Sequence, residues 1–316
     1  MAPSTDEPRI LVVGEALVDI VHRLDGSVTE TPGGSPANVA LGLGRLGRTP
    51  TLLSSIGTDD RGDALRRWLA ESGVALVGTP RERTSTATAE LDSRGAASYR
   101  FAIDWELDAD DAPIADALHV GSIAVALDPG ARAVAQIVDR HRGRALISAD
   151  PNVRPSLVPG TVAARVRMLD LLARADVVKA SDEDLAWMFP GVDLRRAGAE
   201  LLGRGSALVV ITQGAEGVIA LREREAELRV PAVSVDVVDT VGAGDTFMAA
   251  MLDGLVSQGI SGADGRARLR ALHRSTLAEI LQGAAEAASL TVGRPGADLP
   301  SRADLDALRA RTTAPV

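Results

Sequence analysis

Short apolar runs of strand character alternate with longer segments of helical period along most of this chain. In each longer segment, apolar side chains recur every three or four positions, as they do in an amphipathic helix. Repeated strand–helix units predict an α/β protein with a mainly parallel sheet flanked by helices on both faces. The expected strands are residues 10–14, 51–57, 117–122, 145–152, 176–181 and 207–214, and the expected helices begin near residues 36, 63, 130, 162 and 182.

Two strand-like segments interrupt this rhythm, because no helical pattern accompanies them. Residues 17–32 contain a turn at 25–26, and residues 84–104 predict a hairpin with its turn at 93–95. A small antiparallel sheet that projects from the main sheet as a lid explains both segments. No long linker is visible, so residues 1–316 are expected to form a single α/β domain with the lid strands inserted in it.

Several residue types that are absent or rare exclude whole classes of site. The chain has no cysteine and four widely separated histidines, which argues against disulfides, thiolate chemistry and a histidine-built metal centre. Its one lysine is Lys179, so no Walker A phosphate loop can be written. A net charge of -9 argues against nucleic acid as a partner. Without an 18-residue apolar stretch or a signal-peptide core, we expect a cytoplasmic protein without a membrane span.

The stretch VVDTVGAGDTF, residues 237–247, combines glycines and acids where an expected strand at residues 233–238 leads into a helix. Gly242 and Gly244 allow successive backbone N–H groups to point at one spot, and the helix adds its partial positive charge there. Such a turn suits an anion, with Asp245 placed to act as a base on an acceptor hydroxyl. The alternative is an ordinary glycine turn in which Asp245 caps a helix.

A second cluster, GGSPANVALGLGRLG, spans residues 33–47. Gly33 and Gly34 let a ligand approach the backbone, Ser35 can cap a helix, and Asn38 offers a donor and an acceptor, as a polyol site requires. The alternative is a loop followed by a core helix. GLGRLG also matches the dinucleotide-binding pattern, but no strand directly precedes it, so its glycines are expected to permit close helix packing.

Polar residues also follow two of the expected strands, where open α/β sheets bind their ligands. ADPNVRP contains Asp150, Asn152 and Arg154, and KASDEDL contains Lys179 together with Ser181 and Asp184. The second group could meet a phosphate or hydrated Mg²⁺. Helix capping and solvated charge remain the alternative for both groups.

Together, GGSPANVALGLGRLG and DTVGAGDTF resemble the two signature regions of the ribokinase-like carbohydrate kinase family, and GEALVD, DPNVRPSLVPG and KASDEDLAWMFPG are similar to bacterial fructokinases. The resemblance spans residues 9–300 and implies a phosphotransferase that moves the γ-phosphoryl group of MgATP to a primary hydroxyl of a ketose, with fructose 6-phosphate as the expected product. It implies ATP and Mg²⁺ as cofactors and leaves K⁺ and a homodimer open. Together with the strand-end loops, it assigns Asp245 as the base and places Gly242, Ala243 and Gly244 in the anion hole. The residues expected around the sugar are Asp19, Gly33, Gly34, Asn38, Phe101 and Arg154, and those expected around the nucleotide are Lys179, Ser181, Thr212, Gly214 and Gly217. Asp184 is expected to reach Mg²⁺ through water, and Asp239 to lie in a loop that binds a monovalent cation.

Two departures from the family pattern keep alternatives open. Many relatives have N-x-x-E where this chain has SDED, at residues 181–184, and the shorter Asp184 would reach Mg²⁺ only through water. Arg100 in the expected lid could meet a carboxylate, which keeps 2-keto-3-deoxygluconate as a competing acceptor, beside other sugars and nucleosides. An NAD-dependent oxidoreductase rests on GLGRLG alone. A binding protein that lost catalysis would have no need of Asp245.

Overall fold

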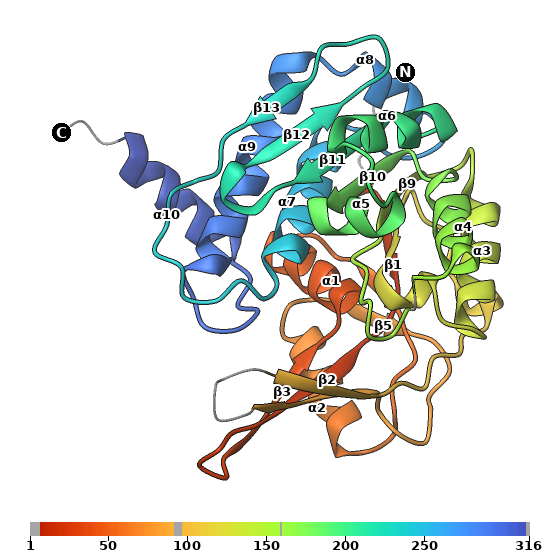
Figure 1. Cartoon of the computed structure of the whole chain (residues 1–316), viewed down its shortest axis with the longest axis vertical. Coiled ribbons are helices and arrows are strands. Elements are labelled where there is room, and N and C mark those ends of the chain that lie inside the picture. Colours follow the sequence, from red (N-terminus) through yellow and green to blue (C-terminus); the bar gives the residue numbers. More distant parts are fainter. Residues whose placement is uncertain (1–6, 92–96, 159, 314–316) are drawn as a thin grey trace.

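The computed structural model describes residues 7–91, 97–158 and 160–313. Its main feature is a nine-stranded sheet with the order β13-β12-β11-β10-β9-β8-β1-β4-β5 (Figure 1). The strands from β5 to β11 in that order pair in parallel, whereas β11, β12 and β13 pair antiparallel. The strands are β1 Ile10–Val13, β4 Thr51–Leu53, β5 Ala75–Val77, β8 Ala117–Gly121, β9 Leu146–Asp150, β10 Val177–Ser181, β11 Leu208–Thr212, β12 Val218–Leu221 and β13 Leu228–Val230.

Helices cover both faces of this sheet, as the strand–helix alternation predicts. They are α1 Ser35–Arg45, α2 Asp60–Ala70, α3 Gly130–His141, α4 Val162–Leu172, α5 Asp182–Met188, α6 Leu194–Arg204, α7 Ala243–Ser257, α8 Gly265–Ala271, α9 Arg274–Val292 and α10 Arg302–Thr313, with 3₁₀ turns η1 Ala109–Asp111, η2 Ser122–Val125 and η3 Gly214–Glu216. No helix in the described ranges is long and apolar enough to cross a membrane.

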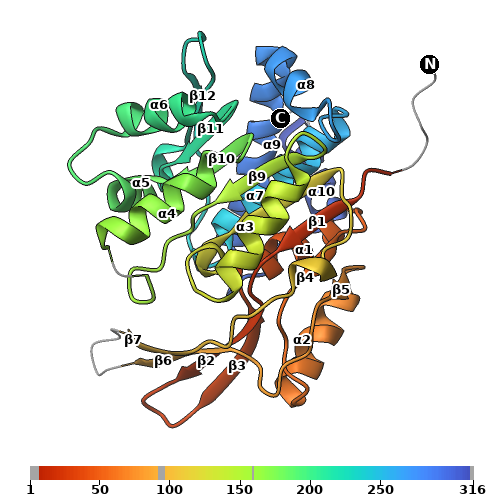
Figure 2. The ribbon, with the colours of Figure 1, turned by 90° about the vertical axis from the view of Figure 1, so that its right-hand side faces the viewer.

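The core has two layers because alternate side chains of each buried strand face opposite sides. In β1, Val12 belongs to the buried cluster that contains residues of α1, α7 and α9, whereas Val13 belongs to the cluster that contains residues of α3, α4 and α6. Figure 2 shows α3 to α6 on one side of the strands and α7 to α10 on the other. This arrangement confirms the predicted fold class.

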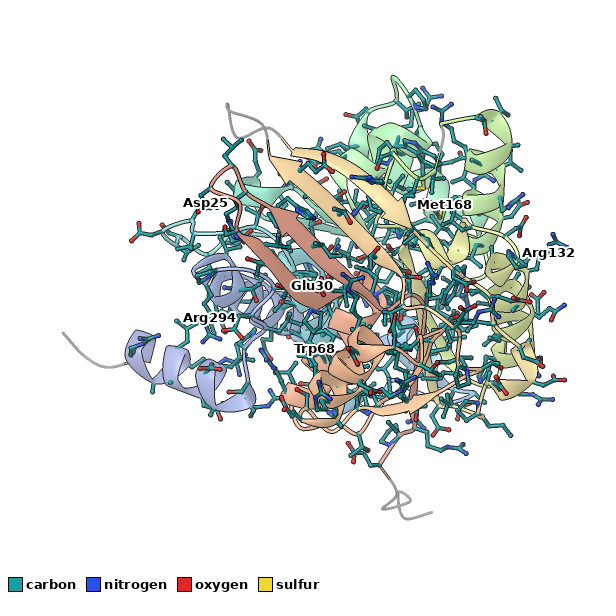
Figure 3. All side chains as sticks on the ribbon, turned by 90° about the horizontal axis from the view of Figure 1, so that it is seen from below. Asp25, Glu30, Trp68, Arg132, Met168 and Arg294 are labelled. Carbon is teal, nitrogen blue, oxygen red and sulfur yellow. The ribbon has the colours of Figure 1, made fainter. Side chains whose placement is uncertain are left out.

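A second, four-stranded sheet projects from one end of the molecule (Figure 2). Its strands are β2 Leu17–His22, β3 Val28–Gly33, β6 Thr86–Leu91 and β7 Ala97–Ala102, in the order β3-β2-β6-β7. The outer pairs are antiparallel and the central pair, β2 and β6, is parallel. Figure 3 views the four strands side by side, with Asp25 at the β2–β3 turn and Glu30 on β3. The expected hairpin turn at residues 93–95 lies outside the described residues.

Glycines 42 and 44 lie inside α1 and allow close packing, as the sequence predicts. A Cβ on Gly42 would lie 2.7 Å from the Cβ of Ala249 in α7, and one on Gly44 would lie 2.0 Å from the backbone oxygen of Ser72. Because GLGRLG is a continuous part of one helix and its C-terminal turn, it cannot form the strand-to-helix loop that binds a dinucleotide.

The predicted strand at residues 233–238 is wrong. Residues 231–239 form no strand, and the side chains of Val237 and Val238 are 69% and 57% exposed. β13 ends at Val230, and Pro231 has no backbone N–H to continue its ladder. The backbone N–H groups of Val238 and Asp239 instead bond to the carbonyl oxygen of Val292, at the end of α9. The alternating valines fit an extended chain, but in the described part of the chain they pair with no strand.

Candidate active site

Asp245 lies in the first turn of α7, buried against the start of α1. One carboxylate oxygen accepts a hydrogen bond from Ser35 Oγ at 2.6 Å and the other from Asn38 Nδ2 at 2.7 Å. The carboxylate therefore bonds to another helix rather than to the free N–H groups of α7, which argues against the capping alternative. Ser35 was expected to cap α1, but the N-cap is Gly34 and Ser35 bonds to Asp245 instead.

The pKa of Asp245 is raised because burial disfavours its charged form. The hydrogen bonds from Ser35 and Asn38, and the charges of Lys179 and Arg154, act in the opposite direction. A carboxylate with a raised pKa is a stronger base, and these bonds fix the directions in which it can accept a proton.

The start of α7 forms the expected anion site. Gly242 is the N-cap in a left-handed conformation at φ 79°, and a Cβ there would lie 2.7 Å from the Cβ of Ala297. The N–H of Thr246 makes the first intrahelical bond, to the carbonyl oxygen of Gly242. The N–H groups of Gly244 and Asp245 come before Thr246 in the helix and point out of its N-terminal end. An anion at that end can accept hydrogen bonds from them.

Lys179 supplies a full positive charge beside this helix end. It is the third residue of β10, and its Nζ lies 3.0 Å from the position that a Cβ on Gly244 would take. Its ammonium donates to Asp150 at 2.8 Å, and both side chains are at least 95% buried. Burial by itself lowers the pKa of Lys179, but the carboxylates of Asp150, Asp184 and Asp245 together outweigh it and the pKa is raised. Lys179 therefore keeps its charge inside the protein.

The loop after β9 brings Asn152 and Arg154 to the same place. Consecutive N–H groups of Asn152 and Val153 bond to Asp150, at 3.2 Å, and Asp184, at 2.7 Å. Arg154 donates to Asn152 Oδ1 at 2.6 Å, and Asn152 Nδ2 lies 3.5 Å from Asp245 Oδ1. The side chain of Asn152 thus stands between Arg154 and the candidate base.

Asp184, the expected Mg²⁺ residue, makes a capping box with Ser181 at the start of α5. One oxygen accepts from the backbone N–H and hydroxyl of Ser181, and the other accepts from Val153 N–H. Its role at Mg²⁺ stays a prediction, because the oxygen that bonds to Val153 keeps one acceptor position for a water while the other oxygen already accepts two bonds.

A pocket of about 280 Å³ lies between the start of α7, the loop after β9 and the start of α5. Its wall includes the expected residues Arg154, Lys179, Ser181, Asp184, Thr212 and Gly244. Gly214 and Gly217 follow in the turn beyond β11 and lie outside this wall. A Cβ on Gly217 would lie 2.3 Å from the carbonyl oxygen of Val230. Close packing therefore explains a glycine at this position without a role in nucleotide binding.

The expected sugar residues lie where the small sheet meets α1. A Cβ on Gly33 would lie 2.3 Å from Asp19 Oδ2, and one on Gly34, at φ 104°, would lie 2.6 Å from the carbonyl oxygen of Glu15. Burial raises the pKa of Asp19 to about 6; the charge of Arg154 lowers it and that of Asp245 raises it. Asn38 Oδ1 is buried and accepts no hydrogen bond from any residue that the structure describes. An unpaired buried acceptor of this kind is suited to a ligand hydroxyl.

The two faces of the small sheet separate Phe101 from Arg100. Asp19, Ala87 and Phe101 are cross-strand partners and share one face, whereas Arg100 pairs with Thr88 and shares the opposite face. Arg100 forms an ion pair with Glu90 on that opposite face. The carboxylate-binding role that the sequence left open for Arg100 is therefore not favoured.

Glu15 is a buried site residue that the sequence reasoning missed. It is 3% exposed just beyond β1, and its carboxylate accepts the N–H of Ala124 at 3.2 Å. Burial raises its pKa to about 7, against the opposing effects of Ser122, Ala124 and the charge of Arg154. A carboxylate two residues beyond a fully apolar strand, in GEALVD, was the available signal.

Asp239, the expected cation-loop residue, joins two loops beside α7. Its carboxylate oxygens accept from the N–H of Val241 at 3.0 Å and that of Gly296 at 2.9 Å. The monovalent-cation assignment stays a prediction.

A family model described as pfkB family carbohydrate kinase matches residues 7–304. A fructokinase of Klebsiella pneumoniae is 36% identical over 265 residues, which are 80% of this chain and 86% of that protein. The crystal structure of a fructokinase with bound ATP from Xylella fastidiosa covers 98% of this chain and 100% of that chain, with a TM-score of 0.88 and 27% identity. A double-mutant fructokinase from Vibrio cholerae, in a form with bound fructose, ADP and potassium ion, covers 95% of this chain and 98% of that chain, with a TM-score of 0.81 and 26% identity.

Proposed function

The chain belongs to the pfkB family of carbohydrate kinases, and we propose that it transfers the γ-phosphoryl group of ATP to the 6-hydroxyl of fructose. The names of the similar fructokinases, and the ATP, ADP and fructose in the titles of the similar structures, support this choice of substrates.

One observation carries the proposal: acceptor groups for hydroxyls meet an anion site at Asp245. On one side are Asp19 and the unpaired Asn38 Oδ1, which suit hydroxyl donors. On the other side are Lys179 and the start of α7, which suit phosphate oxygens. A base between a polyol site and a phosphate site is what phosphoryl transfer to a sugar requires.

In the proposed reaction, Asp245 accepts the proton of the sugar hydroxyl as its oxygen forms a bond to the γ-phosphorus. The terminal phosphoanhydride bond breaks, and ADP leaves with that electron pair. The hydrogen bonds from Ser35 and Asn38 hold the carboxylate in position. The N–H groups at the start of α7 and the Lys179 ammonium offset charge on the transferred group, which is the main task in such a reaction.

Mg²⁺ fits this site as an ion that accompanies the nucleotide. Within the described ranges, no group of three or more His, Cys, Asp or Glu could hold a metal ion. Mg²⁺ commonly keeps several waters and binds through substrate phosphates and one or two carboxylates. Asp184, in the pocket wall, would contact its water shell, and Mg²⁺ would screen the phosphate charge. For K⁺, the loop at Asp239 remains the proposed position.

We also propose that the small sheet closes over the sugar. It supplies Asp19 and Phe101 to the acceptor side, and it projects from the main sheet, where closure would exclude water from the reacting atoms (Figure 1). The homodimer and the cytoplasmic location stay predictions.

A neutral ketose fits better than 2-keto-3-deoxygluconate. Arg154 is the one expected sugar residue that carries a positive charge, and Arg100 pairs with Glu90 on the far face of the small sheet. Asp19 and Asp245 on the acceptor side would repel a carboxylate.

ATP-dependent phosphorylation of fructose, 2-keto-3-deoxygluconate, ribose, tagatose and adenosine tests the proposal. We expect the highest kcat/KM with fructose. Arg154→Gln should lower kcat/KM for fructose modestly, and Arg100→Gln, the matched control, should leave acceptor preference unchanged. If Arg154 bound a substrate carboxylate, its loss should cost about 1.5 to 3 kcal/mol. A higher kcat/KM with 2-keto-3-deoxygluconate than with fructose would show that fructose is the wrong substrate, but it would not contradict the kinase mechanism.

A further inference from the structure

We propose that Asp150, which the sequence reasoning gave no role of its own, is a positioning residue that couples the sugar side of the site to the phosphate side. This inference rests on the proposed function. It concerns a chain of contacts that runs from Arg154 through Asn152 and Asp150 to Lys179.

The two oxygens of Asp150 serve different sides of the site. Oδ2 accepts from the Lys179 ammonium at 2.8 Å, beside the start of α7. Oδ1 accepts from the backbone N–H of Asn152 at 3.2 Å. The side chain of Asn152 lies between Arg154 and Asp245. Because Asp150 is 1% exposed at the end of β9, both of these contacts lie inside the protein.

Asn152 is held in a conformation that few residues adopt. Its φ is 35°, in the left-handed region, where non-glycine residues are uncommon and asparagine is among the best tolerated. The bonds from its own N–H to Asp150 and from the next N–H, of Val153, to Asp184 hold this conformation. The result is that the Asn152 amide reaches toward Asp245 while its oxygen orients Arg154.

Lys179 needs the carboxylate partner, because its ammonium lies next to a helix end that also carries partial positive charge. An ammonium has three N–H donors, and Asp150 uses one of them. The others can bind phosphate oxygens in the shared pocket. A sugar that orders Arg154 and Asn152 should therefore also order Asp150 and Lys179 for the nucleotide, and the reverse must hold by linkage.

The experiment measures fructose affinity by calorimetry with and without a non-hydrolysable ATP analogue and Mg²⁺. For the wild-type protein we expect the analogue to tighten fructose binding about fivefold or more. Asp150→Asn should reduce this enhancement to less than about twofold and lower kcat, because Lys179 loses its fixed position.

Asn152→Gly interrupts the same series of contacts at a second position. The variant should fold, because glycine tolerates the left-handed conformation. It keeps the N–H that bonds to Asp150 but removes the amide, so it should also abolish the enhancement. Its KM for fructose should rise, whereas its affinity for the analogue alone should stay near that of the wild type.

Asp176→Asn is the matched control. Asp176 lies at the other end of the sheet, just before β10, where it accepts from Arg266 at 2.6 Å and from the N–H of Ile147 at 2.9 Å. Its loss should lower the melting temperature and leave the enhancement intact.

A wild type without enhancement, or an Asn152→Gly variant that keeps it in full, overturns the inference. If Asp150→Asn lowers the affinities for fructose and for the analogue equally and keeps the enhancement, Asp150 has a structural role only, and the inference is again overturned. A wild type that neither binds nor phosphorylates fructose contradicts the proposed function instead.

Discussion

Asp245→Asn should separate catalysis from stability. The variant keeps the size of the side chain and one acceptor oxygen for the Ser35 hydroxyl, but it cannot take a proton. Its new amide donor faces Asn38, whose Nδ2 now donates to Asp245 and whose Oδ1 has no partner. Rotation of the Asn38 amide therefore restores the hydrogen bond to residue 245 and turns Nδ2 toward the sugar side. A sugar hydroxyl can accept from Nδ2 as readily as it can donate to Oδ1, so sugar affinity should change little.

The expected loss of kcat is about 10² to 10⁴-fold, the usual contribution of a general base, which raises the barrier by about 2.7 to 5.4 kcal/mol. The free energy of unfolding should instead increase at neutral pH. The folded-state pKa of Asp245 is raised by burial, so its ionised form opposes folding wherever it is charged. The gain in stability should disappear as the pH falls through the folded-state pKa toward the ordinary value of 3.8.

Steady-state kinetics and urea unfolding at several pH values measure both effects. Asp253→Asn is the matched control, because Asp253 is a buried aspartate of the same helix that pairs with Arg48 and Arg302. That variant should lose stability and keep kcat. Near-normal turnover by Asp245→Asn would remove Asp245 as the base, and a loss of stability at neutral pH would refute the argument from burial.

Three further predictions concern the surroundings of the site. Ser35→Ala removes a hydrogen bond that lowers the pKa of Asp245, so the acid limb of the kcat/KM profile should move to higher pH; an unmoved limb would show that Asp245 does not titrate there. Gly42→Ala places a methyl group 2.7 Å from the Ala249 Cβ and should lower the free energy of unfolding, measured in urea, by about 1 to 3 kcal/mol. In the same measurement Gly203→Ala, at a helical position with open space, should raise the free energy of unfolding by up to about 1 kcal/mol. Saturating fructose should slow amide exchange in β6 and β7 more than in β1; equal protection of all three strands would contradict closure of the small sheet.

The sequence by itself determined most of the elements of this protein and their order. Apolar periodicity located the parallel strands and their helices, and glycine spacing located the start of α7, because both signals are carried by neighbouring residues. The end of a parallel strand is also a local feature, so Asp150, Lys179 and Arg154 could be named in advance as polar residues at the site edge.

Only the tertiary structure decided which of these polar groups face one another. Ser35 was expected to cap its own helix, yet it bonds to Asp245, 210 positions away. Residues 233–238 alternate as a strand does, but among the residues that the structure describes they join no sheet. Hydrogen-bond partners and burial are set where distant segments cross. A local pattern states what a residue can do, and the packed chain decides which groups it meets and whether water reaches it.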